Sequence, residues 1–280
     1  MGLRVIFLCV FLLATLSLSH ASSSKKPKPE NEWSRIHTPS SGHPAPIGFY
    51  SNGCLRGAEL LNDNGEGYQG MKLSQRRKYG HPETLRFVQN LGKHMAELHS
   101  GILVEDIGLA RGGPMPSGHA SHQIGLDVDI WYWTHPAQNR RLLTSKERET
   151  LSSVTLLNRK HQVNPKRFTK LIIEKLKFAA EYPEVDRIFV NPAIKFYLCV
   201  QDSTQTWLHK LRPWPGHEEH FHVRLRCPKA ANGDTNDCKV QEPIPPGSGC
   251  DQIDLNMKIE PHPEIPPAPL PEACTKLIKE

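Results

Sequence analysis

Histidines and carboxylates gather in two short segments of the 280-residue chain, residues 117–131 and residues 216–224. Five of the fifteen histidines lie there: His119, His122, His217, His220 and His222. Imidazole and carboxylate both suit Zn²⁺, which takes about four ligands in a tetrahedron. A catalytic zinc keeps one position for water, so the two segments indicate a zinc site with three protein ligands.

Residue spacing suggests how these groups meet. Residues two apart share one face of a strand, so His220 and His222 are expected to point the same way while Phe221 packs behind. Asp127 and Asp129 share a face for the same reason. We therefore predict two neighbouring strands whose polar faces meet at one metal.

His122 precedes Asp129 by seven residues and cannot occupy the same regular strand face. Gly125 between them permits a turn that brings both side chains toward one point. Other interpretations remain open here. Single histidines are more often surface or hydrogen-bonded residues, and two aspartates can simply cap loops. A histidine-rich run can also store metal passively, but such runs are usually poor in the apolar residues that flank these histidines.

The surrounding sequence indicates the elements that hold these segments. Apolar residues with helical spacing predict a helix over 82–99, and Thr144 with Glu147 forms a capping box for a helix over 144–158. Asn-Pro pairs open two more helices, over 164–182 and from 191 to 199. Strands are expected at 101–110 (with a break), 126–133, 187–190 and 220–225. This mixture predicts an α+β fold, with a small antiparallel sheet core that carries the zinc site between flanking helices.

The amino terminus indicates export. Arg4 precedes an apolar run over residues 5–18, and Ser19-His20-Ala21 supplies small residues for cleavage. We interpret residues 1–21 as a Sec-type signal peptide cut after Ala21, with an uncleaved anchor as the alternative. No later stretch is apolar enough to span a membrane. Six cysteines remain after the signal is removed, which suggests three disulfides among fifteen pairings.

The remaining chain divides by composition. Residues 22–48 are rich in Ser, Lys and Pro and are expected to form a flexible leader. Residues 49–241 form the predicted domain that carries the zinc site. Residues 242–280 are proline-rich, which forbids regular structure, but Cys250 and Cys274 are expected to fix the segment to the domain surface.

Overall charge favours anionic partners. The net charge of +6 falls by one, to +5, when Arg4 leaves with the signal. A basic exported protein suits anionic polymers such as bacterial cell wall, and no nucleic-acid-binding motif occurs. Residues 49–241 contain neither a Gly-x-Ser-x-Gly nor a Ser-x-x-Lys motif, so a serine acyl-enzyme is not indicated.

Taken together, these motifs resemble a known family. The order His-x6-Asp followed by His-x-His resembles zinc peptidases grouped with lysostaphin, D-alanyl-D-alanine peptidases and the hedgehog amino-terminal domain. More narrowly, the chain resembles the penicillin-insensitive murein endopeptidase family, from about Ile47 to Cys274. Five motifs carry this likeness: Arg111-Gly-Gly, Ser117–Trp131, Phe189–Lys195, Arg212-Pro-Trp214 and Gly216–Arg224.

The resemblance implies roles for individual residues. It makes His122, Asp129 and His222 the zinc ligands and places His217 and His220 nearby, as residues needed for catalysis. His119 is associated with an additional metal, together with an acidic residue and a histidine further along. His161 matches that histidine, but Asn158 stands where the carboxylate is expected. The implied disulfides are Cys54–Cys274, Cys199–Cys250 and Cys227–Cys238.

The implied reaction is hydrolysis of D-alanyl–meso-diaminopimelyl cross-link peptides of peptidoglycan in the periplasm, insensitive to penicillin. His220 is our first choice for proton transfer, ahead of His217 and Glu218. Three tryptophans, Trp131, Trp133 and Trp214, either shape a substrate groove or belong to the core. A D,D-carboxypeptidase or dipeptidase and a non-catalytic wall-binding protein are the alternatives, and the oligomeric state is open between monomer and homodimer.

Overall fold

The computed structural model describes residues 30–116, 119–138, 140–229, 237–251, 253–258 and 268–280. The expected signal peptide and its cleavage point at Ala21 lie outside these residues. Within the described part, no helix has the length and hydrophobicity that a bilayer crossing requires.

A seven-stranded sheet with the strand order β10-β9-β11-β8-β7-β5-β4 forms the centre of the molecule. Its members are β4 (Asn64–Gly65), β5 (Tyr68–Gly70), β7 (Ile102–Val104), β8 (Asp127–Trp131), β9 (Val185–Val190), β10 (Leu211–Pro213) and β11 (His220–Leu225). The central pairs β9–β11, β11–β8 and β8–β7 are antiparallel, whereas β10–β9 and β5–β7 are parallel. Two small antiparallel sheets lie outside it, formed by β1 (Ala45–Phe49) with β2 (Asn52–Arg56) and by β3 (Glu59–Leu60) with β6 (Tyr79–Gly80).

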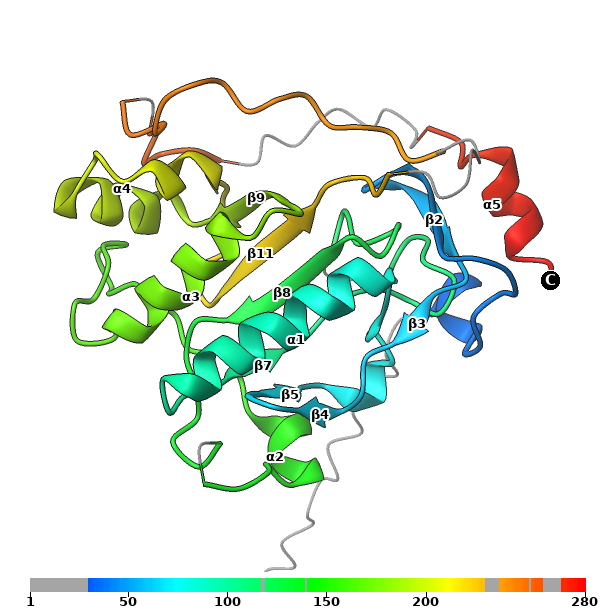
Figure 1. The fold of residues 1–280 in the computed structure, drawn as a ribbon, viewed down its shortest axis with the longest axis horizontal. Helices are drawn as coiled ribbons and strands as arrows, with labels where there is room; N and C mark the ends of the chain where they lie inside the picture. The colour runs from blue at the N-terminus through cyan, green and yellow to red at the C-terminus, as the bar shows by residue number, and fades with distance from the viewer. Residues whose placement is uncertain (1–29, 117–118, 139, 230–236, 252, 259–267) are drawn as a thin grey trace, which may run out of the picture.

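Helices complete the α+β fold that the sequence predicts. They are α1 (Pro82–Glu97), α2 (Ser145–Thr150), α3 (Lys170–Glu181), α4 (Pro192–Gln201) and α5 (Glu272–Leu277), with 3-10 turns η1 (Trp33–Arg35), η2 (Leu73–Gln75) and η3 (Thr206–Lys210). Figure 1 shows α1 and α3 lying across one face of the central sheet. The opposite face is therefore available to carry polar chemistry.

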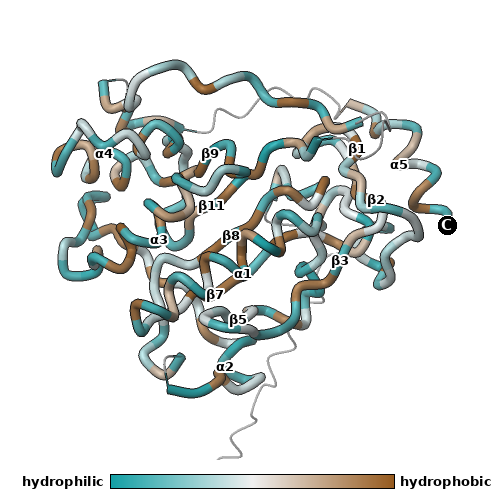
Figure 2. Tube along the Cα trace, in the orientation of Figure 1, coloured by the Kyte–Doolittle hydropathy of each residue, from teal (hydrophilic) through white to brown (hydrophobic). Residues whose placement is uncertain are grey.

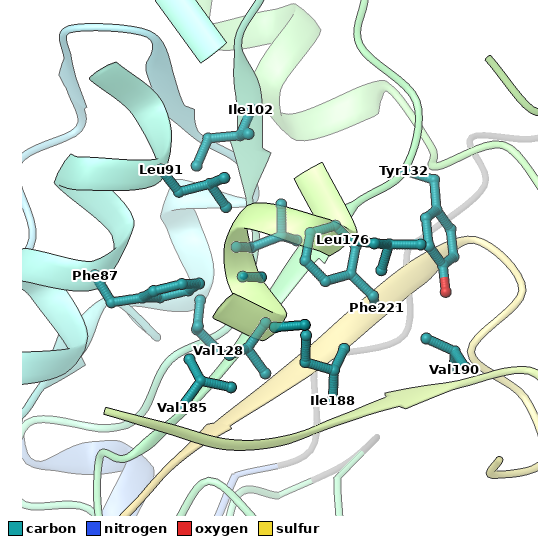
Figure 3. Close-up of a cluster of buried hydrophobic side chains, with 14 of the residues drawn as sticks. Phe87, Leu91, Ile102, Val128, Tyr132, Leu176, Val185, Ile188, Val190 and Phe221 are labelled. Atoms are coloured by element: carbon teal, nitrogen blue, oxygen red, sulfur yellow. The ribbon is translucent and has the colours of Figure 1, made fainter. Parts of the chain in front are cut away.

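Strand alternation explains why one face of the sheet is apolar. Val128 of β8 and Phe221 of β11 are fully buried on the face covered by the helices, where they meet Phe87 and Leu91 of α1 and Leu176 of α3 (Figure 3). Figure 2 shows hydrophobic residues concentrated around β7, β8 and α1, with hydrophilic residues along the outer loops. Because Asp127, Asp129, His220 and His222 alternate with these core residues, they face the other side.

Helix boundaries differ from the predicted ones in two places. The capping box of Thr144 and Glu147 is confirmed, but α2 ends at Thr150 because Leu151 is already extended. The helix expected from Asn164 begins only at Lys170. The Asn164 carbonyl instead accepts hydrogen bonds from the N–H groups of Arg167 and Phe168, which closes a separate turn.

The described structure also begins earlier than the sequence indicates. Trp33 is 3% exposed and joins a second hydrophobic cluster with Ile47 of β1 and Leu277 of α5. Trp33 and Ile47 both belong to the expected leader, residues 22–48. The three disulfides connect Cys54 with Cys274, Cys199 with Cys250 and Cys227 with Cys238, as the resemblance implies. The first of these ties β2 to α5 and fixes the carboxyl-terminal segment beside β1.

Candidate metal centre

Strands β8 and β11 bring the two histidine-rich segments together. In their antiparallel register, His222 lies opposite Asp129 and Arg224 lies opposite Asp127. The side chains of these four residues therefore share one face. The His222 Nδ1 atom lies 3.2 Å from Asp129 Oδ1, and both residues are buried.

His122 reaches the same point through the turn that precedes β8. Gly125 has a φ of +67°, as the sequence suggests, and a Cβ there would lie 2.3 Å from the Leu55 side chain. His122 itself has a φ of +69°, a left-handed conformation that is uncommon for a residue with a side chain. Its Nδ1–H donates to the Ile107 carbonyl at 3.0 Å, which leaves Nε2 facing Asp129 Oδ2 at 3.3 Å.

His119 joins the cluster beside His122. Its Nδ1 lies 3.4 Å from Asp129 Oδ2, while its Nε2 lies 2.7 Å from Asp106 Oδ2. Asp106 also accepts from Arg77 Nη1 at 3.1 Å. The sequence analysis missed Asp106, although an acidic pair inside the apolar stretch 101–110 was a signal that a carboxylate is buried there.

Several polar atoms at this centre are buried and lack a hydrogen-bond partner. They include His122 Nε2 and Asp129 Oδ1, the two atoms that face the point where the histidines meet Asp129. Ligand atoms of His119, His122 and Asp129 all lie within 4.8 Å of one another. Since an unpartnered buried polar group costs about 1–3 kcal/mol, their convergence fits a metal-binding site. The residues present are those that suit zinc.

Two further histidines border the centre. His220 Nε2 lies 3.8 Å from Asp129 Oδ1, and the ring of His217 lies 5.0 Å from that of His220, centroid to centroid. His217 follows Gly216 and also adopts a left-handed φ, +51°. Its Nδ1–H donates to the Pro215 carbonyl at 3.1 Å, which fixes the orientation of the ring.

Burial and neighbouring charges shift the protonation of these groups. Burial, with the nearby His222 and His220, lowers the pKa of His217 to about 4, and burial also lowers the pKa of His220. Burial disfavours protonated His222 too, but Asp127 and Asp129 outweigh it and raise the pKa of His222. Burial opposes ionisation of Asp129, yet the surrounding histidines hold its pKa well below the usual range.

Glu218 and the tryptophans that the sequence suggests for the site make their contacts outside the histidine cluster. The Glu218 carboxylate lies 3.5 Å from the Thr155 hydroxyl, and its carbonyl accepts from the Leu156 N–H. Trp131 is 1% exposed and its Nε1–H donates to Glu105 at 2.5 Å, so it belongs to the interior. Trp214 is 46% exposed and stacks edge-on against Phe189, whose ring also contacts His222.

Residues expected at an additional metal site form a turn instead. The Asn158 carboxamide oxygen accepts from the N–H groups of Lys160 and Gln162, and His161 is exposed with a φ of +56°. Among the contacts of the described residues, none joins this turn to His119. The structure brings His119 to Asp106 and Asp129, on the side of the cluster where His122 lies.

Comparison with known proteins identifies the family of this chain. A family model described as penicillin-insensitive murein endopeptidase matches residues 46–279. The chain is 39% identical over 284 residues to a penicillin-insensitive murein endopeptidase of Klebsiella pneumoniae strain 342, covering 96% of this chain and 97% of the relative. It is 40% identical over 279 residues to the protein of the same description from Escherichia coli O127:H6, with the same coverage.

Proposed function

The chain belongs to the penicillin-insensitive murein endopeptidase family, and from this premise we propose that it is a periplasmic zinc metallo-endopeptidase. Its proposed substrates are the D-alanyl–meso-diaminopimelyl cross-links of peptidoglycan, the polymer that its relatives' names indicate. The observation that carries the zinc assignment is the convergence of buried His122 Nε2 and His222 Nδ1 on Asp129, where His122 Nε2 and Asp129 Oδ1 lack a hydrogen-bond partner.

These three residues would hold one zinc ion. Zn²⁺ bound there supplies an acidified water and polarises the scissile carbonyl. Asp129 is central to the proposed site because its oxygens face both sides, Oδ2 toward His122 and Oδ1 toward His222. His119 lies beside Asp129 Oδ2 and is a further ligand candidate, although as a fourth protein ligand of the same ion it would take the position that the water needs. A second ion has less support, since Asn158 and His161 lie in a separate turn.

Proton transfer falls to the histidines at the edge of the cluster. His220 is the first candidate because its Nε2 reaches toward Asp129 Oδ1 from the same strand face as His222. His217 lies next to it and is the second candidate, because its Nδ1–H is bound to the Pro215 carbonyl and its Nε2 can accept a proton. The exposed ring of Trp214, packed on Phe189, offers an apolar wall beside these groups for the peptide.

Cross-linked muropeptide dimers test the proposal directly. Purified mature protein should convert dimers to monomers when zinc is present, should stop when a chelator removes the metal, and should be unaffected by penicillin. Loss of a terminal D-alanine without dimer cleavage would indicate a carboxypeptidase instead. Unchanged dimers in the presence of bound zinc would contradict the enzymatic assignment and indicate a wall-binding protein.

A further inference from the structure

Asp127 lies beside the proposed zinc ligands, but its own two oxygens are already engaged by other groups. The side chain is fully buried. Arg224 forms a bidentate (forked) ion pair with it, in which Nε donates to Oδ1 at 2.8 Å and Nη2 donates to Oδ2 at 3.2 Å. Such a two-pronged pair fixes the orientation of a carboxylate as well as balancing its charge. Asp127 is thus suited to orienting neighbours and poorly placed to bind a metal.

Two of the proposed ligands touch this one carboxylate from different segments of the chain. The backbone N–H of His122 donates to Asp127 Oδ2 at 3.0 Å. His222 Nε2 lies 3.0 Å from Asp127 Oδ1, at ion-pair distance but outside good hydrogen-bond alignment, while Nδ1 of the same ring faces Asp129. A single side chain therefore connects the turn before β8 with strand β11.

We propose that Asp127, held in place by Arg224, is a positioning residue that sets the tautomer of His222 and the backbone conformation of His122. The inference rests on the proposed zinc function. A carboxylate facing Nε2 keeps the ring proton on that nitrogen and leaves the Nδ1 lone pair directed toward Asp129. At His122, the accepted N–H secures a left-handed backbone conformation that is unfavourable for a residue with a side chain.

Arg224 is itself held on several sides, which makes the fork rigid. Its guanidinium carbon lies 4.0 Å from the centroid of the Tyr50 ring and 5.0 Å from that of Phe189. Its Nη1 donates to Gln241 Oε1 at 2.9 Å. Because lysine provides neither the fork nor the planar stacking surface, it cannot replace arginine here without loosening Asp127.

Asp127→Asn tests the proposal at nearly constant volume. Zinc affinity is measured with Zn²⁺ alone against a competing chelator, without any peptidase assay. Replacing a carboxylate that hydrogen-bonds a metal ligand typically weakens metal affinity about 10–100-fold. The zinc dissociation constant of Asp127→Asn should therefore rise by that factor. Arg224→Lys should raise it in the same direction but by less. In parallel, long-range ¹H–¹⁵N spectra of the metal-free wild type, recorded at a pH where His222 is neutral, should show its ring proton on Nε2.

Asp186→Asn is the matched control. It makes the same substitution in another aspartate–arginine pair on the neighbouring strand β9, where Arg187 Nε lies 2.6 Å from Asp186 Oδ2. This variant should bind zinc within about twofold of the wild type, because a purely structural charge pair leaves the ligands in place.

Either of two results would overturn the positioning role: a neutral His222 ring protonated at Nδ1 in the wild type, or a folded Asp127→Asn variant with wild-type zinc affinity. If Asp127→Asn does not fold, the zinc affinity of Arg224→Lys and the tautomer of His222 in the wild type decide whether Asp127 has the positioning role. A wild-type protein that binds no zinc would instead refute the proposed function, and the tautomer measurement would still judge the role of Asp127 separately.

Discussion

His222 and Asp129 face each other across strands β11 and β8, with His222 Nδ1 3.2 Å from Asp129 Oδ1. Their meeting follows from the two-residue period of each strand and from an antiparallel register that aligns both histidine-rich segments. The other oxygen of Asp129 faces His122. One buried carboxylate thus connects the two segments, and the predictions below depend on that arrangement.

Removal of one ligand should abolish turnover. His122→Ala deletes the Nε2 atom that faces Asp129 Oδ2, so zinc-dependent cleavage of muropeptide dimers should fall by at least about 100-fold. Bound zinc, measured by elemental analysis, should fall with it. His161→Ala is the control, since His161 is exposed in a separate turn, and it should retain wild-type activity. Full activity in His122→Ala would refute the ligand assignment.

Substitution of His220 should impair proton transfer without weakening zinc binding. His220→Gln should lower kcat by about 10²–10⁴-fold, the usual contribution of a general acid or base, while zinc affinity stays near that of the wild type. Glu218→Gln should have an effect of less than about twofold, because its carboxylate lies beside Thr155. Steady-state kinetics with defined muropeptides make the comparison. A larger loss in Glu218→Gln than in His220→Gln would transfer the role to Glu218.

Because of Lys175, the free energy of unfolding should increase with pH in the alkaline range. This fully buried amine donates to the Tyr132 carbonyl and the Thr134 hydroxyl, and burial lowers its pKa to about 7 from the usual 10.5. Between these pH values the unfolded chain binds the additional proton, so the free energy of unfolding should rise with pH by up to about 1.4 kcal/mol per pH unit.

Denaturant unfolding of the wild type and Lys175→Met from pH 6 to pH 9 measures this effect. The difference between the two stability curves should increase above pH 7 in favour of the wild type. A difference that does not change with pH would show that Lys175 has the same proton occupancy in the folded and unfolded chains.

The Cys54–Cys274 disulfide should contribute more stability than Cys227–Cys238. Its cysteines are 220 residues apart, against 11 for the other pair, and closing a longer loop removes more entropy from the unfolded chain. Replacing each pair with alanines should cost about 2–5 kcal/mol, with the larger loss for Cys54 and Cys274. Unfolding midpoints of the two double variants compare them, and the reverse order would contradict the loop-length argument.

Local periodicity accounts for what the sequence could predict. Strand alternation correctly placed His220 with His222 and Asp127 with Asp129, and Gly125 correctly marked the turn after His122. The helix over 82–99 was also identified, because its apolar spacing is regular.

Tertiary contacts account for what the sequence could not predict. The acidic pair at Glu105 and Asp106 indicates a buried carboxylate, but strand and helix periodicity do not report that Asp106 meets His119 across an irregular loop. The Asn164-Pro165 pair carries the signals of a helix start, yet the same signals close a turn, and α3 begins at Lys170. Likewise, Trp33 looks like part of a polar leader until the carboxyl-terminal helix α5 supplies the surface that buries it.

The most direct test of the central claim is the zinc stoichiometry of activity. Metal-free mature protein is titrated with Zn²⁺ while the conversion of cross-linked muropeptide dimers to monomers is followed. Activity should rise in proportion to added zinc and reach its plateau at one ion per chain, held by His122, Asp129 and His222. Full activity without metal, or a plateau reached only at two ions per chain, would contradict the account.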